Sequence, residues 1–205
     1  MAEQVRNRTA VQENFHHDID VLDTVAYLLY KDASREEPDV TPLKLQKILY
    51  IAQANYLAAT NFRLFDEPVE AFENGPVVHR ITKLYFGRQI IVARDEEVSD
   101  WENIDTRLPE DIRDFLDRVW DQCKDLSASA LWSRAHVESP WLDSYVKDSY
   151  RTVIPDELMA TFYSEHIEAD KRILHSAVVL IPKDFLDDAA EDDLELDCLR
   201  SFFAA

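Results

Sequence analysis

The chain has 205 residues, 46% of them hydrophobic, so it is long enough and apolar enough to bury the core of one domain. Its 41 acidic residues outnumber 22 basic ones, giving a net charge of −19. Such a surface repels phosphate backbones, so we expect no direct binding of nucleic acid. With only two glycines, Gly75 and Gly87, the chain has neither a Walker loop nor a dinucleotide-binding fingerprint.

The sequence predicts a cytoplasmic protein that does not contact a membrane. No apolar run approaches the roughly 20 residues that span a bilayer. The first residues lack the apolar segment of a signal peptide. Cys123 and Cys198 lie far apart and outside any C-x-x-C pair, so we expect two free thiols, with Cys123 in the core.

The first part of the chain predicts a polar arm and then a helix. Residues 1–17 are polar and show no periodicity, so we expect an N-terminal arm. From Asp18 onward, apolar residues recur at three- and four-residue steps, which is typical of an amphipathic helix. These residues are Ile19, Leu22, Val25, Ala26 and Leu29.

A second helix is predicted to begin at Thr41 and Pro42. Thr41 can cap it, and Pro42 fits the first helical position because the N–H it lacks would be unpaired there. Apolar residues cover more than one side and leave a narrow polar edge with Lys44, Lys47 and Asn55. A helix this apolar is usually central and packed on two sides.

The next segment predicts a small hairpin and a third helix. RLFDEPVEAF reads as two short extended runs with a turn at residues 66–68. Asn74-Gly75-Pro76 reads as a turn followed by a helix start, with Gly75 at positive φ and Pro76 in the first helical turn. Gly87 is a candidate C-cap, and residues 90–92 are a candidate strand.

The clearest helical pattern covers residues 109–126. Its apolar positions match a helical face over three turns: Ile112, Phe115, Leu116, Val119, Trp120 and Cys123. We expect further helices from Ser127 to His136, at Pro140-Trp141, and from Pro155 through Phe162.

The overall prediction is a mostly α fold: a compact single helical domain over residues 18–163, with a small β-hairpin or short strands. Residues 164–205 form an acidic C-terminal extension, in which residues 184–197 carry eight acids and no base. That charge run reads as a solvated tail, or as a cover for a basic surface on a partner. Residues 176–181 are a candidate edge strand.

Four blocks, occurring in order between Leu22 and Phe162, resemble the Panacea domain of the SocA-like antitoxin family. The blocks are TPLKLQKILYIAQ, LFDEPVEA, GPVV and LWSRAHVESPW. The positions that match the family's motif are Thr41, Pro42, Lys44, Leu45, Gln46, Lys47, Tyr50, Gln53, Gly75, Pro76, Val77, His136, Pro140 and Trp141. Phe72, His79 and Ala135 stand where the family commonly has Trp, Pro and Thr.

The resemblance implies an antitoxin, encoded beside a toxin, that neutralises this toxin by direct protein–protein binding. Family members are paired with many unrelated toxins, so the resemblance does not name the toxin. One alternative is a proteolytic adaptor that delivers the toxin to a cytoplasmic protease. A further alternative is an enzyme that uses His136, although no nucleophile with a supporting acid stands near it in sequence.

Four residues are candidates for partner binding: Lys44, Lys47, Trp132 and His136. The two lysines read as a solvated face, as partners in internal salt bridges, or as a contact with an acidic patch on a partner. Trp132 reads as a core residue, like the other tryptophans, or as an exposed anchor, because interface hot spots favour tryptophan. A neutral His136 beside Trp141 is expected to hydrogen-bond a backbone carbonyl and to lock the turn at Ser139-Pro140.

We expect no metal, no cofactor and no enzymatic activity. The six histidines include no H-E-x-x-H motif, and His166 and His175 lie nine residues apart. The C-terminal Phe202-Phe203-Ala204-Ala205 resembles the Ala-Ala tails that bacterial unfoldases engage. The alternative is that its two phenylalanines dock on the domain.

Overall fold

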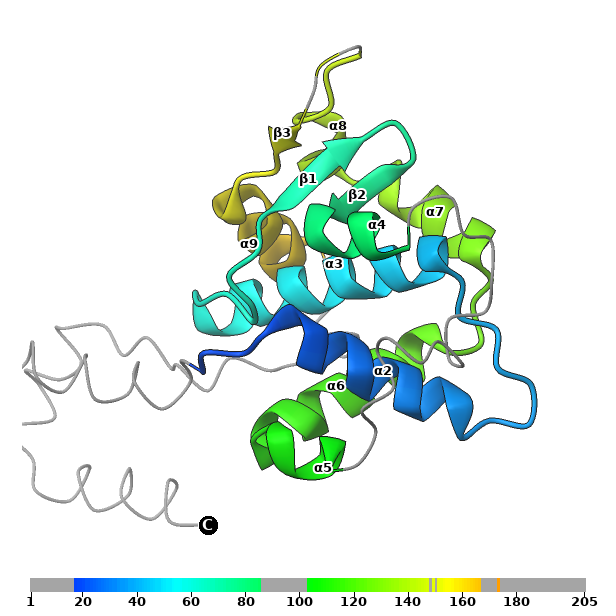
Figure 1. Ribbon diagram of the computed structural model, residues 1–205. Helices are drawn as coiled ribbons and strands as arrows, with labels where there is room; N and C mark the ends of the chain where they lie inside the picture. The colour runs from blue at the N-terminus through cyan, green and yellow to red at the C-terminus, as the bar shows by residue number, and fades with distance from the viewer. Residues whose placement is uncertain (1–16, 86–102, 148, 150, 167–172, 174–205) are drawn as a thin grey trace, which may run out of the picture. The chain divides into compact units, whose positions relative to one another are not determined.

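The computed structural model describes residues 17–85, 103–147, 149, 151–166 and 173 (Figure 1). The chain divides into two units, Met1–His175 and Ser176–Ala205, and the second contains no described residue. Several predictions fall outside the described residues: the arm over residues 1–16, the Gly87 cap, the strands at 90–92 and 176–181, the acidic run and the C-terminal tail. Ile173, which does belong to the described part, is buried in the core.

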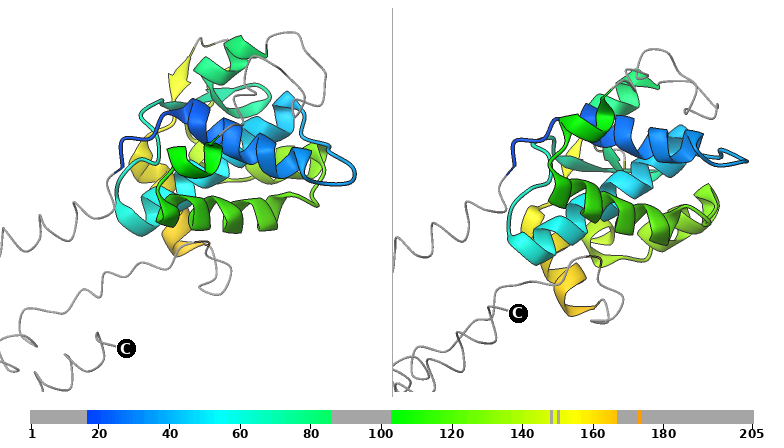
Figure 2. Two further views of the ribbon diagram at one scale, coloured as in Figure 1. Left: turned by 60° about the horizontal axis from the view of Figure 1, so that its bottom comes forward. Right: turned by 90° about the horizontal axis from the view of Figure 1, so that it is seen from below.

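Helix α3, Pro42–Thr60, lies at the centre of the described unit (Figures 1 and 2). It begins as predicted, because the Thr41 side chain accepts a hydrogen bond from the Lys44 N–H at 3.3 Å and Pro42 occupies the first turn. All its residues from 44 to 57 are buried. A helix enclosed on every side needs neighbours all round it, and α3 contacts α4, α6, α7, α9 and β2.

The other helices confirm the mostly α prediction. Helix α2 packs against α5 and α6, and α8 packs against α9. Their bounds are α2 Val21–Ala33, α4 His79–Leu84, α5 Ile104–Arg107, α6 Glu110–Cys123, α7 Ala128–Ala135, α8 Ser139–Leu142 and α9 Asp156–Glu165.

The periodic patterns placed these helices well. All six apolar positions predicted for the face of α6 are buried, including the free thiol of Cys123. The Ser127 side chain caps α7 by accepting from the Ala130 N–H at 3.1 Å. Helix α9 follows Pro155, and α8 contains Pro140 in its first turn.

A three-stranded antiparallel sheet lies over one side of α3 (Figure 1). Its strands are β1 Val69–Phe72, β2 Gly75–Val78 and β3 Thr152–Val153, in the order β2-β1-β3. In the β1–β2 hairpin, Val69 pairs with Val78 and Phe72 pairs with Gly75. β3 joins the free edge of β1, where Glu70 pairs with Val153.

The position of the hairpin corrects two predictions. Its turn is at Glu73-Asn74 and not at residues 66–68. Pro76, expected in the first turn of a helix, lies in β2, and α4 begins only at His79. Because β2 is an edge strand, a proline that lacks an N–H is tolerated in it.

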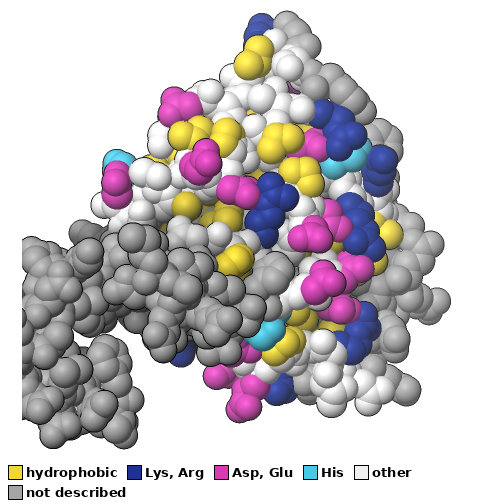
Figure 3. All heavy atoms as spheres, turned by 90° about the vertical axis from the view of Figure 1, so that its left-hand side faces the viewer, with side chains coloured by type: hydrophobic (Ala, Val, Ile, Leu, Met, Phe, Trp, Pro, Cys, Tyr) yellow, Lys and Arg dark blue, Asp and Glu magenta, His cyan; other side chains and the backbone are white. Residues whose placement is uncertain are grey.

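Charged side chains of both signs lie among apolar ones on the face shown in Figure 3, which is the left-hand side of Figure 1. Within the described residues, no helix is both long enough and apolar enough to cross a membrane.

Candidate functional site

The polar residues of α3 point into the protein. The side chains of Lys44 and Lys47 are 0% exposed, and Asn55 is also buried. The interpretation of these lysines as a solvated face is therefore wrong. A buried polar group destabilises the fold unless it has a hydrogen-bond partner, and each of these three side chains has one.

Two side chains of α3 bind the backbone of strand β2. The Gln46 side-chain amide donates to the Val78 carbonyl at 3.2 Å, and its carbonyl oxygen accepts from the Val78 N–H at 2.7 Å. The next residue, Lys47, donates from its ammonium group to the Pro76 carbonyl at 2.9 Å. Gln46 thus acts like one residue of a neighbouring strand, and β2 is fixed to the central helix.

Two further side chains bind the turn of the hairpin from the α7–α8 segment. The Trp141 indole N–H donates to the Phe72 carbonyl at 2.9 Å. The His136 Nε2 lies 3.0 Å from the Glu73 carbonyl oxygen. We call Gln46, Lys47, His136 and Trp141 the hairpin clamp, because their side chains all bind backbone atoms between residues 72 and 78.

His136 links the end of α7 to the hairpin. Its ring lies between those of Trp132 and Trp141, with centroid distances of 3.8 and 4.2 Å. Its Nδ1 is 2.7 Å from the Trp132 carbonyl oxygen, so both ring nitrogens face carbonyl acceptors. The expected carbonyl bond is present, but it holds the hairpin turn rather than the turn at Ser139-Pro140. A neutral imidazole has one N–H and donates to one of the two carbonyls at a time.

Gly75 is required where the clamp meets the turn. Its φ is 91°, as predicted, whereas Glu73 and Asn74 keep negative φ values. The turn therefore ends on a glycine in the left-handed region, which glycine adopts without a steric cost. A Cβ at Gly75 would lie 2.8 Å from the Lys47 Nζ and 2.9 Å from the His136 Cε1, so a side chain there would also displace the clamp.

We expect Gly75→Ala to lower the free energy of unfolding by ~1–3 kcal/mol, measured by urea denaturation. Asn61 provides a matched control, since it also has a left-handed conformation, with φ of 60°, and is exposed. The stability difference between Asn61→Gly and Asn61→Ala should therefore report the backbone cost of a Cβ without a collision. A loss in Gly75→Ala equal to this difference would show that the space beside Lys47 and His136 does not matter.

The Lys47 ammonium is enclosed between the hairpin and α3. Its burial lowers the pKa of the amine from 10.5 to about 7. A large fraction of the molecules therefore carry a neutral amine at this position near pH 7. Direct contact of Lys44 or Lys47 with a partner stays a prediction, and the burial of both side chains disfavours it.

A second polar network joins α3 to α9 through the carboxylate of Glu138. Glu138 is 4% exposed and accepts from the Tyr50 hydroxyl at 2.8 Å and from the Tyr163 hydroxyl at 3.1 Å. The Arg134 Nε donates to the same carboxylate at 3.1 Å. Burial, followed by the charges of Tyr163 and Glu138, raises the pKa of Tyr50 well above its ordinary value.

The sequence interpretation missed three members of this network: Arg134, Glu138 and Tyr163. A local signal existed, because Arg134 and Glu138 stand four residues apart, the spacing of a helical ion pair. Tyr50 was identified only as a motif position. Its acceptor lies 88 residues further along the chain.

Gln53 fixes the segment that leads into the hairpin. Its side-chain carbonyl accepts from the backbone N–H groups of Leu64 at 2.9 Å and Phe65 at 3.3 Å. Its amide donates to the Phe65 carbonyl at 3.1 Å. The two glutamines of the motif thus hold both ends of the segment from residue 64 to residue 78.

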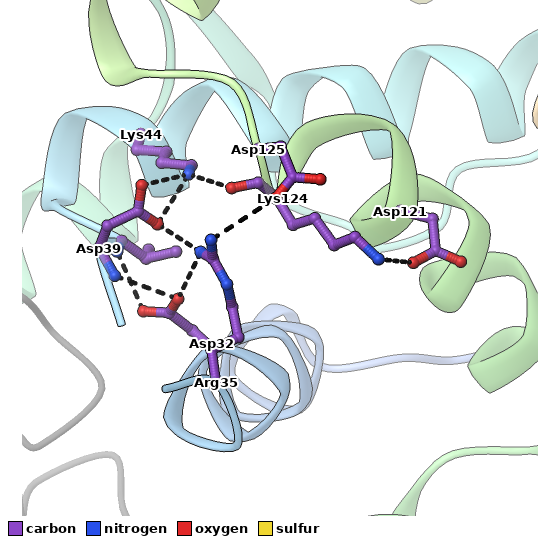
Figure 4. Close-up of polar contacts among 8 residues, drawn as sticks. Asp32, Arg35, Asp39, Lys44, Asp121, Lys124 and Asp125 are labelled. Atoms are coloured by element: carbon purple, nitrogen blue, oxygen red, sulfur yellow. Dashed lines mark hydrogen bonds and ion pairs between the residues drawn. The ribbon is translucent and has the colours of Figure 1, made fainter. Parts of the chain in front are cut away.

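Figure 4 shows how the start of α3 is held. The Lys44 ammonium lies 2.8 Å from an Asp39 carboxylate oxygen and 2.7 Å from the Lys124 carbonyl oxygen. Arg35 joins Asp39 to the buried Asp32, which accepts from the Val40 N–H at 3.0 Å. Burial would raise the pKa of Asp39, but Lys44 and Arg35 lower it. The internal salt bridge that was one interpretation of Lys44 is therefore present.

Trp132 is 37% exposed on α7, as the alternative of an exposed anchor requires, and its role in binding stays a prediction. Its ring packs against that of the half-buried His136 of the clamp. Within the described residues, no group of three or more His, Cys, Asp or Glu side chains is arranged to hold a metal ion.

Residues 45–142 match the family model described as antitoxin SocA-like, Panacea domain. This stretch of the chain is thus similar to the Panacea domain of that family. The matched range includes most of α3, the hairpin, α7 and α8, so all four residues of the hairpin clamp and the exposed Trp132 belong to it. No curated protein and no solved structure matches the chain.

Proposed function

We propose that this Panacea-domain protein is a cytoplasmic antitoxin that neutralises a cognate protein toxin by binding it directly. The observation that carries the proposal is the match of residues 45–142 to an antitoxin domain family. The toxin is expected to be the product of the adjacent gene. No enzymatic step, cofactor or direct nucleic-acid contact is part of the proposal.

The geometry of the motif supports a binding role. The polar atoms of Gln46, Lys47 and Trp141 are engaged with backbone groups of the hairpin. Both ring nitrogens of His136 face backbone carbonyl oxygens. The alternative of an enzyme needs His136 as a free catalytic base, whereas here the imidazole contacts the backbone and has a structural role. These residues therefore hold the hairpin in one conformation. A surface that is ordered before binding favours association with a protein partner, because less conformational entropy is lost.

We expect co-expression of this protein to restore growth to cells that express the toxin encoded by the adjacent gene. The two proteins should also co-purify. Toxin abundance separates masking from proteolytic delivery: an unchanged toxin level supports masking, and a level that falls only in the presence of the antitoxin supports delivery to a protease. Absence of both rescue and co-purification would contradict the antitoxin proposal.

A further inference from the structure

The tip of the hairpin is fixed through its backbone while its side chains face solvent. Glu73 and Asn74 are both exposed. The carbonyl of Glu73 is bound by His136, and the carbonyl of the preceding Phe72 is bound by Trp141. A partner that binds this tip would therefore not have to order its backbone, and the entropic cost of binding is reduced.

An exposed indole lies beside this tip. Trp132 is 37% exposed, and its ring is 3.8 Å from the imidazole of His136, centroid to centroid. The same imidazole contacts the Glu73 carbonyl at 3.0 Å. The imidazole of His136 thus contacts both the exposed acidic residue Glu73 and the exposed ring of Trp132. Val137, next in sequence to His136, is 75% exposed and adds apolar surface.

An exposed acidic residue and an exposed indole that both contact one imidazole suit a cationic group. Tryptophan is the best of the aromatic rings for stacking with a guanidinium or ammonium group, and a carboxylate binds a guanidinium through paired hydrogen bonds. The neighbouring cations of this chain are already engaged: Arg134 with Glu138, and Lys47 with the Pro76 carbonyl. The net charge of −19 also favours encounter with a basic partner.

We propose that the tip of the hairpin and Trp132 form a docking surface for an arginine- or lysine-bearing surface of a partner protein. We call Glu73, Asn74, Trp132 and Val137 the tip surface. The inference rests on the proposed function, and the partner is then the toxin itself. The buried motif residues act as positioning residues, because they fix the backbone that presents the tip surface.

The test measures affinity for the purified product of the adjacent gene by titration calorimetry, at low and at physiological salt. Glu73→Lys and Trp132→Ala should each weaken binding by roughly tenfold or more. Glu73→Lys should also reduce the loss of affinity that added salt causes. The controls are Glu36→Lys, a charge reversal in the exposed loop after α2, and Leu158→Ala on α9, whose side chain is 37% exposed like that of Trp132.

Folding is followed by the melting temperature of each variant. Glu73→Lys changes a solvent-exposed side chain and keeps the carbonyl that His136 binds, so its affinity can be compared directly with that of the wild type. If the wild type does not bind the neighbouring product, the proposed function fails. If the wild type binds and Glu73→Lys and Trp132→Ala bind equally well, the tip surface is wrong and the antitoxin function stands. If Trp132→Ala weakens binding and Glu73→Lys does not, the basic character of the partner is contradicted.

Discussion

Replacing Glu138 with alanine should lower the free energy of unfolding by ~3–5 kcal/mol. The buried carboxylate is the shared acceptor of Tyr50, Tyr163 and Arg134. Its removal leaves two buried hydroxyls and a partly buried guanidinium without their acceptor, and each loses the interaction that compensated for its desolvation. Because the network connects α3, α7 and α9, the loss should appear as a lower midpoint of global urea unfolding.

The controls for this prediction separate the network from surface charge. Asp143→Ala removes an exposed acid at the C-cap of α8, the short helix whose N-cap is Glu138. This change should alter the free energy of unfolding by no more than ~0.5 kcal/mol. Tyr50→Phe removes one hydroxyl from the network and should cost ~1 kcal/mol. If Glu138→Ala were no more destabilising than Asp143→Ala, the carboxylate would not have the structural role assigned to it.

The helices were predictable because their information is local. The face of α6 repeats over three turns, and the starts of α3 and α7 carry Thr41 and Ser127, which cap in the structure as their types predict. An exposed Trp132 was also predictable as one alternative for a tryptophan on a short helix. These features depend on neighbours within a few residues, which the sequence displays directly.

The hairpin and the inward-facing lysines depend on partners far along the chain. Gly75-Pro76 suits a helix start as well as a strand, and only the pairing of Pro76 with Ala71 makes it part of β2. A lysine on a helix edge is usually solvated, and the acceptor that draws Lys47 inward is 29 residues away. The local sequence pattern does not identify so distant an acceptor, so the burial of Lys47 could not be predicted from it.

The stability of the protein should rise with pH between about pH 7 and pH 9 because of Lys47. The pKa of this amine is about 7 in the folded protein against an ordinary value of 10.5. Between these values the unfolded chain binds a proton that the folded chain does not, so raising the pH favours the folded state. Two pH units correspond to ~2–3 kcal/mol at 1.36 kcal/mol per unit. Above about pH 10 the raised pKa values of Tyr50 and Tyr163 act in the opposite direction.

Lys47→Met tests this prediction, since methionine fills similar space and does not titrate. The variant leaves the Pro76 carbonyl without its donor, so its stability differs from that of the wild type at every pH. The informative quantity is therefore the difference between the two free energies of unfolding, which should change by ~2–3 kcal/mol from pH 7 to pH 9. Lys147→Met, at an exposed lysine, should follow the wild-type curve. A constant difference between wild type and Lys47→Met would mean that the Lys47 amine stays protonated in the fold, with its charge stabilised by the hairpin carbonyls.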